Sequence, residues 1–183
     1  MGFGVDEAEQ MLAEVFAPWV VDLGLKPLGF DETGGRFLLP ANDRLVHVGG
    51  VICGQAAASA ADTCAVVALA AVNGRFRYCS TVDLSAKFMR PLPPGDAEIR
   101  VTVLSNGKRM AYAQADIRSS GADKIAEKGV HFCSHDFHSG VERLREGCQA
   151  YSFAFQPAEF QRLTKGMRDV IFRLHLDDAK HWP

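Results

Sequence analysis

The most distinctive pattern along the chain is a stretch at residues 54–73 that is rich in alanine and apolar on almost every side. Its length and small side chains predict a helix, and the Asn73-Gly74 pair is typical of a helix end. A helix that is apolar nearly all round has to be buried on most sides. We therefore expect residues 54–73 to form the central helix of the fold.

Beyond this helix the pattern changes to strict alternation. In residues 80–88 the side chains on one face are Val82, Leu84, Ala86 and Phe88, and those on the other are Thr81, Asp83, Ser85 and Lys87. The alternation recurs at 97–103 and 111–118, and a further strand is expected at about 124–134. Residues 25–40 read as two short strands around a Glu-Thr-Gly-Gly turn. Short links favour antiparallel neighbours, so the predicted class is α+β: a curved antiparallel sheet wrapped around the central helix.

The two ends of the chain have helical patterns. A first helix is expected at about residues 6–22, with Asp6 as its N-cap. Residues 137–183 are predicted to form a helical extension, because a capping box at 139–142 and Pro157 both open helix-like stretches. We therefore expect one domain at residues 1–136, followed by a helical C-terminal extension at 137–183.

Composition narrows the class of protein but not its chemistry. The 183 residues are 48% hydrophobic and 23% charged, which is ordinary for a soluble globular protein. The net charge of −2 argues against nucleic-acid binding through bulk charge, and the longest apolar run, Cys64–Val72, is too short to cross a bilayer. The N-terminus lacks a signal-peptide pattern, and the five cysteines form no CxxC pair. We expect a cytoplasmic protein with no nucleic-acid or membrane partner.

The polar residues of the central helix are gathered on one side. Gln55, Ser59 and Asp62 share a face, and Thr63 lies at its edge. Desolvation raises the pKa of a carboxyl in such surroundings and makes it a better base. The N–H groups at the helix start, Gly54 and Gln55, form a site for a developing oxyanion. The alternative is structural: Asp62 caps a loop or pairs with an arginine at a subunit contact, and the pattern fits both.

Three stretches carry a resemblance to a known family. Residues 53–69, 80–96 and 107–132, together with 17–30, resemble the hotdog-fold acyl-CoA thioesterases of the phenylacetate-degradation type. The family opens its central helix with His-Gly-Gly and places an acid seven residues after the second glycine. These places fall on Cys53, Gly54, Gln55 and Asp62. The family's Phe-x-Arg-Pro strand motif is present at Phe88, Arg90 and Pro91.

The resemblance implies a hotdog fold and a homodimer or homotetramer with active sites between subunits. It implies hydrolysis of an acyl- or aryl-acyl-CoA with no metal and no cofactor beyond the coenzyme A of the substrate. Asp62 is then expected to act as general base or nucleophile, with backbone N–H groups at Gly54 and Gln55 holding the oxyanion. For such a reaction we also expect Ser59 and Thr63 to orient the water or the acid. Cys53 and Gln55 depart from the family pattern, because Cys53 lacks an imidazole and Gln55 adds a side chain.

Further residues are candidates for contacts with the substrate. Cations beside strand ends suit the phosphates of coenzyme A, although solvated surface charge explains each one equally well. These cations are Lys87, Arg90, Lys108 and Arg109. Cys53 and the loop residue His47 are expected to border the site. Three potential metal ligands alternate near the end of the last strand and would share one of its faces: His131, Cys133 and His135. No second ligand pair accompanies them, so no metal site is predicted.

A second function, from a different class, also fits the sequence. The chain would then be a non-catalytic hotdog module that binds acyl-CoA for sensing or scaffolding. The altered Cys53 and Gln55, together with the C-terminal extension, favour this alternative. A hotdog hydratase is a third option, but the chain has no Asp/His pair at the spacing of that family's motif.

Overall fold

The computed structural model describes residues 3–134 of the chain. In these residues three α-helices, one 3-10 helix and six strands follow one another. They are α1 (Val5–Glu14), α2 (Pro18–Val21), β1 (Lys26–Asp31), β2 (Gly34–Leu39), η1 (Asp43–Leu45), α3 (Gly54–Val72), β3 (Ser80–Phe88), β4 (Ala97–Asn106), β5 (Met110–Ser119) and β6 (Glu127–Ser134). The predicted helical extension, 137–183, lies outside the described residues.

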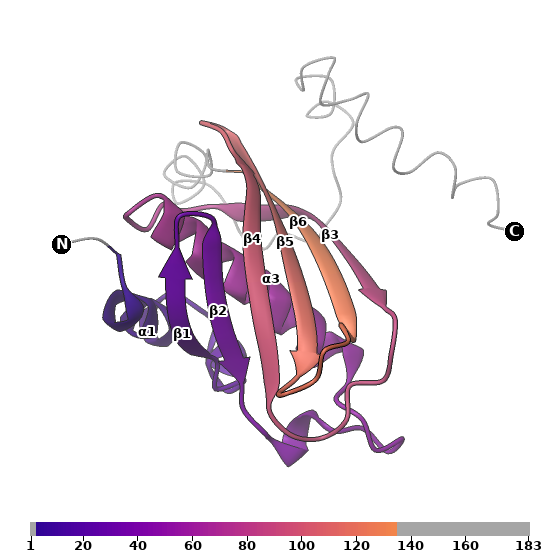
Figure 1. The fold of residues 1–183 in the computed structure, drawn as a ribbon. Helices are drawn as coiled ribbons and strands as arrows, with labels where there is room; N and C mark the ends of the chain where they lie inside the picture. Colours follow the sequence, from indigo (N-terminus) through magenta and orange to yellow (C-terminus); the bar gives the residue numbers. More distant parts are fainter. Residues whose placement is uncertain (1–2, 135–183) are drawn as a thin grey trace, which may run out of the picture. The chain divides into compact units, whose positions relative to one another are not determined.

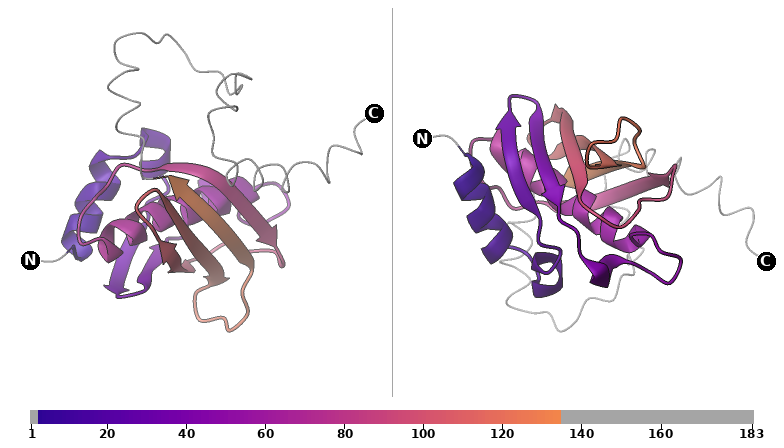
Figure 2. Two further views of the ribbon diagram at one scale, coloured as in Figure 1. Left: turned by 90° about the horizontal axis from the view of Figure 1, so that it is seen from above. Right: turned by 60° about the horizontal axis from the view of Figure 1, so that its bottom comes forward.

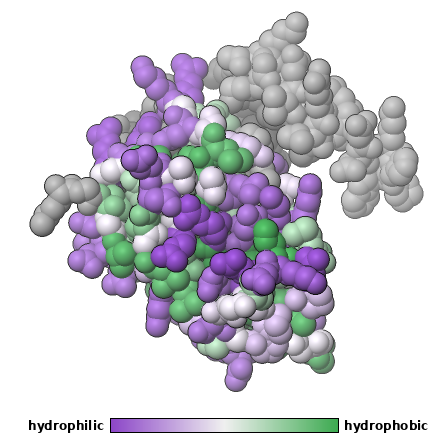
Figure 3. Space-filling view, viewed as in Figure 1, coloured by the Kyte–Doolittle hydropathy of each residue, from purple (hydrophilic) through white to green (hydrophobic). Residues whose placement is uncertain are grey.

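The six strands form one antiparallel sheet in the order β1-β2-β4-β5-β6-β3. The sheet curves around α3, and α1 lies beside β1 at the other edge from β3 (Figures 1 and 2). The outer face of the sheet is mostly hydrophilic, with separate hydrophobic patches (Figure 3). The predicted α+β architecture, a curved antiparallel sheet around a central helix, is confirmed.

The small side chains of α3 explain how the sheet comes so close to it. Ala57, Ala60, Ala61, Ala65 and Ala68 are all at most 3% exposed, and they form one core with the inner side chains of the sheet. Because alanine loses no side-chain rotamers on burial, such a helix forms readily and packs tightly.

The ends and the setting of α3 follow from its sequence. Asn73 is the C-cap and Gly74 adopts φ +67°, a conformation that glycine takes without strain, so the predicted helix end is confirmed. By length and composition alone, α3 is also the one helix in the described part of the chain that could cross a membrane. Here 61% of its most apolar 18-residue window is buried inside the domain.

The N-terminal helix differs from the prediction. Instead of one helix at 6–22 there are two, because Pro18 has no N–H to donate and starts a new helix as its first residue. The N-cap is Gly4 and not Asp6, and the Glu7 carboxylate accepts a hydrogen bond of 2.9 Å from the Gly4 N–H. The chain therefore turns sharply before β1.

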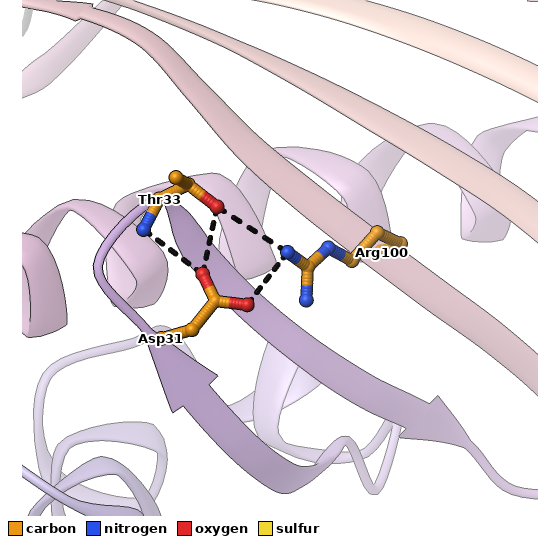
Figure 4. A network of polar contacts seen from close by, with 3 residues as sticks. All are labelled: Asp31, Thr33 and Arg100. Carbon is orange, nitrogen blue, oxygen red and sulfur yellow. Dashed lines mark hydrogen bonds and ion pairs between the residues drawn. The ribbon is translucent and has the colours of Figure 1, made fainter.

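A polar network fastens the β1–β2 hairpin to β4 (Figure 4). The Asp31 carboxylate accepts hydrogen bonds from the Thr33 hydroxyl (2.7 Å) and N–H (2.9 Å) and from the Arg100 guanidinium (2.7 Å). The hydroxyl of Thr33 and the guanidinium of Arg100 hold the pKa of Asp31 well below its usual range. This network connects neighbouring strands at the turn, so we assign it a structural role.

Candidate active site

Asp62 lies on α3 and is half-buried. Its Oδ1 atom accepts a hydrogen bond of 2.6 Å from the hydroxyl of Thr81, at the start of β3. A hydroxyl donor fixes the direction in which a carboxylate points and stabilises its ionised form. The acid is thus held in one orientation by a residue that the sequence did not indicate.

A β-bulge explains why Thr81 reaches Asp62. Regular alternation predicts that Thr81 and Phe88 point to opposite faces of β3. The pairing register with β6 shifts between Thr81 and Asp83, which inserts one extra residue on β3. The shift turns Thr81 toward α3, so the predicted alternation is wrong at the start of this strand.

The other polar residues of α3 are arranged differently from Asp62. Thr63 is only 4% exposed, and its hydroxyl donates to the Ser59 carbonyl at 2.8 Å, one turn back along the helix. Ser59 is half-buried. This hydrogen bond satisfies a buried hydroxyl, and orientation of the water or the acid by Ser59 and Thr63 stays a prediction.

The amino end of α3 presents free backbone donors. Cys53 is the N-cap without a side-chain cap bond, and its carbonyl accepts from Ala56 N and Ala57 N at 3.1 and 3.2 Å. The N–H groups of Gly54 and Gln55 have no acceptor among residues 3–134. These two donors, at the positive end of the helix dipole, are suited to an anionic oxygen.

An open pocket of about 240 Å³ lies beside this helix end. Its lining includes the exposed side chain of Gln55 and the indole of Trp19, which is 61% exposed. Arg44 and Asp22 also line the pocket, with 4.0 Å between their charged atoms. The side chain at position 55 therefore points into space large enough for part of a small ligand.

The two motifs of the resemblance meet in space at the helix start. A Cβ atom at Gly54 would lie 3.1 Å from the Phe88 ring, so only glycine fits beneath it without a shift. Arg90, two residues on, donates from Nη1 to the Ile125 carbonyl at 2.9 Å. In this chain Arg90 therefore holds the β5–β6 connection against the end of β3.

The four predicted phosphate-binding cations form two separate pairs. Lys87 and Arg90 lie near the end of β3, whereas Lys108 and Arg109 lie in the β4–β5 turn, level with the start of β3. Measured along the strand direction, the two pairs are separated by seven residues or more, which is over about 20 Å. Within one chain the two pairs cannot contact the same phosphate.

His47 lies in the loop before α3, as predicted. It is exposed, and its Nδ1 accepts a hydrogen bond of 2.9 Å from the Gly49 N–H. Within residues 3–134 no group of three or more His, Cys, Asp or Glu side chains is arranged to hold a metal ion. His135 lies outside the described residues, and the absence of a metal site stays a prediction.

A buried acid was missed by the sequence analysis. Glu127, the first residue of β6, is 2% exposed, and neither of its carboxylate oxygens has a hydrogen-bond partner among the described residues. Burial raises the pKa of Glu127 to about 7. A glutamate next to a lysine is typical of an exposed strand end, so the sequence contained no signal of this burial.

Comparisons with known proteins agree with this fold. Residues 49–126 match the model of the thioesterase superfamily. A conserved protein of Pseudomonas aeruginosa is 26% identical, with a TM-score of 0.60 over 69% of this chain and 96% of its own. A thioesterase from Haemophilus influenzae is 22% identical, with a TM-score of 0.65 over 73% of this chain and 91% of its own.

A further solved structure carries the same fold. A phenylacetic acid degradation-related protein of Ralstonia eutropha is 21% identical, with a TM-score of 0.59 over 69% of this chain and 98% of its own. No curated protein matches the chain in its sequence. From the sheet, the central helix and the solved structures together, we conclude that this chain has the hotdog fold, and its residues 49–126 are similar to the thioesterase superfamily.

Proposed function

We propose that this protein hydrolyses acyl- or aryl-acyl-CoA thioesters, with Asp62 as its catalytic acid–base or nucleophile. The observation that carries the proposal is the position of Asp62, the single charged residue of α3, half-buried and oriented by the Thr81 hydroxyl at 2.6 Å. A carboxylate held in this way can accept the proton of an attacking water or attack the carbonyl carbon itself. The thioesterase superfamily match supports the same chemistry.

The remaining part of the proposed site is the amino end of α3. The backbone N–H groups of Gly54 and Gln55 stabilise the oxyanion that forms when the thioester carbonyl is attacked. Gln55 and Asp62 are seven residues apart on one helix, which is about 10 Å along its axis. A carbonyl bound at Gln55 therefore cannot meet Asp62 of the same chain, and we propose that each site combines the two from different copies.

An apolar strip on the edge strand supports this assembly. Val82, Leu84, Phe88 and Met89 on or next to β3 are 50%, 37%, 58% and 49% exposed. In residues 3–134 this strand has a paired neighbour, β6, on one side only. Edge strands with apolar side chains pair readily with another chain. We propose a second copy of this protein at β3, in a dimer or tetramer.

Replacing Leu84 by glutamate is expected to break this assembly into single chains, because a charge buried at the strand edge has no partner there. Light scattering coupled to size-exclusion chromatography measures the mass directly. Leu104→Glu serves as the control, since Leu104 is 50% exposed but lies on β4. An unchanged mass for Leu84→Glu would place the interface elsewhere.

Replacing Thr81 by valine is expected to lower kcat about tenfold with little change in KM. The variant loses a hydrogen bond to a charged group but keeps the shape of the side chain, and such bonds contribute about 1.5–3 kcal/mol. Steady-state kinetics with one acyl-CoA measures the effect. Thr102→Val removes a hydroxyl from β4 and is expected to leave both constants unchanged; equal losses in the two variants would contradict the assigned role of Thr81.

The proposal as a whole is tested with a panel of acyl-CoA thioesters of different acyl groups, assayed by release of free thiol. Hydrolysis of at least one member is the expected result. Thermal stabilisation by an acyl-CoA without thiol release would instead support the binding module, which the exposed Gln55 side chain at the helix start favours. Neither stabilisation nor release would oppose both functions.

The proposal includes contacts with coenzyme A and a location. The two cation pairs are far apart in one chain. We therefore propose that one coenzyme A molecule contacts only one of the two pairs of a given chain, and that it reaches this pair across the subunit boundary. No metal or further cofactor takes part in the proposed reaction. Cys53 and Cys64 are free thiols, which supports a cytoplasmic location.

A further inference from the structure

Glu127 is a buried acid that the proposed reaction leaves without a role. Residues directly opposite each other in antiparallel strands point to the same face. Glu127 is opposite Phe88 on β3 and opposite Ile117 on β5, and Ile117 is fully buried in the core against α3. The Glu127 side chain therefore points toward the helix side of the sheet. Its two oxygens have no partner in the described residues.

The strand residues directly opposite Glu127 are uncharged, and the Arg90 guanidinium, at the end of β3, donates to the Ile125 carbonyl. From β3 it is faced by Phe88 and from β5 by Ile117. On β6 the next residue, Lys128, points the other way and lies 3.7 Å from Asp116 on the outer face. The start of α3 carries no charged side chain before Asp62. Burial alone raises the pKa of Glu127 to about 7, so a large fraction of the carboxyl is protonated near neutral pH.

Phe88 lies next to both Glu127 and the start of α3. The Phe88 ring contacts the position where a Cβ of Gly54 would lie, and Phe88 is the strand partner of Glu127. Phe88 is 58% exposed, and exposed side chains change rotamer readily, so its ring can move away from Gly54. Access of a substrate to Glu127 requires such a movement. In the proposed reaction the thioester carbonyl accepts from the Gln55 N–H, which belongs to the residue next to Gly54.

We propose that Glu127 is a further catalytic residue of this site and donates its proton to the sulfur of the leaving thiol. The inference rests on the proposed thioester hydrolysis. Water adds to the carbonyl carbon and gives a proton to Asp62, the carbon–sulfur bond breaks, and the electron pair of that bond goes to sulfur. Sulfur takes the proton of Glu127, leaving a free thiol, a carboxylic acid and an ionised Glu127. The proton on Asp62 returns through solvent, and Glu127 is reprotonated from solvent.

The chemistry of the two groups suits this step. A thiol of the alkyl type has a pKa of about 8.5, so its thiolate takes a proton from an ordinary carboxylic acid readily. A carboxyl that is already ionised has no proton to give, and burial without a partner makes that ionisation less favourable. General acid catalysis by a positioned group contributes about 10²–10⁴-fold to the rate.

The experiment compares two leaving groups in wild type and Glu127→Gln. One substrate is an acyl-CoA, and the other carries the same acyl group on a more acidic aryl thiol, which leaves without protonation. We expect Glu127→Gln to lower kcat for the acyl-CoA about 10²-fold and to leave kcat for the aryl thioester within about threefold. Asp116→Asn, a carboxyl-to-amide change on the outer face, is expected to change neither.

The outcomes separate the two proposals. Equal losses on both substrates, or full activity on the acyl-CoA, would overturn the role of Glu127 alone. Asp62→Asn is expected to lose both substrates, since it removes the base and not the acid. Wild-type protein that releases thiol from neither substrate would overturn the proposed function together with this inference.

Discussion

Replacing Asp62 by alanine is expected to lower kcat for thioester hydrolysis about 10²–10⁴-fold or more, while the protein stays folded. The loss follows because Asp62 is the only carboxylate on α3, and because alanine at this half-buried place fits the surrounding small side chains. Free-thiol release from an acyl-CoA measures the activity, and thermal unfolding verifies the fold.

A second variant tests where the parts of the site come from. Gln55→Pro removes one N–H at the helix start, where proline is tolerated in the first turn. Mixed assemblies of Asp62→Ala with Gln55→Pro chains are expected to regain about a quarter of the wild-type activity, because half of randomly paired dimers contain one intact site. Full activity of Asp62→Ala would remove Asp62 from the mechanism, and no recovery on mixing would place both parts in one chain.

Glu127→Gln is expected to stabilise the protein at alkaline pH by about 3 kcal/mol relative to wild type and to leave it unchanged at low pH. Burial raises the pKa of Glu127 from 4.5 to about 7, so the folded state binds the proton more tightly than the unfolded state. Wild-type stability is therefore complete below about pH 4.5 and falls as the pH rises through 7. Glutamine cannot ionise and escapes this loss.

Chemical denaturation of both proteins at pH 4.5 and at pH 8.5 measures the difference. Glu98→Gln is the matched control, because Glu98 is a half-buried strand glutamate whose carboxylate is paired with Arg118 at 3.0 Å. Parallel stability curves for wild type and Glu127→Gln would show that Glu127 finds a partner when ionised. If the proposed proton donation is also correct, the same variant is more stable and less active, a common trade-off at functional sites.

The sequence predicted the parts of the fold that depend on local pattern. The alanine-rich run and its Asn73-Gly74 end specify α3, because alanine favours a helix and glycine takes the positive φ at its end without strain. Alternation specifies the strands, and the antiparallel pairing follows from the short turns. The resemblance identified Gly54 and Phe88 as parts of two separate motifs, and their contact was found only in the structure.

The features that were missed depend on contacts between distant segments. One extra residue in β3 decides the direction of Thr81, and residue types alone do not mark a bulge. Glu127 has the composition of an exposed position, and only the neighbouring strands bury it. The division of the N-terminal helix was a local matter, and Pro18 was its signal.

The close packing of α3 against the sheet has a consequence for how this protein can change. Several alanines of the helix are fully buried, and adding even one or two carbons to a dense core costs about 1–3 kcal/mol. The centre of the helix is therefore closed to adaptation toward larger or smaller acyl groups. New substrate preferences have to arise at its exposed ends and along β3, where side chains already meet solvent.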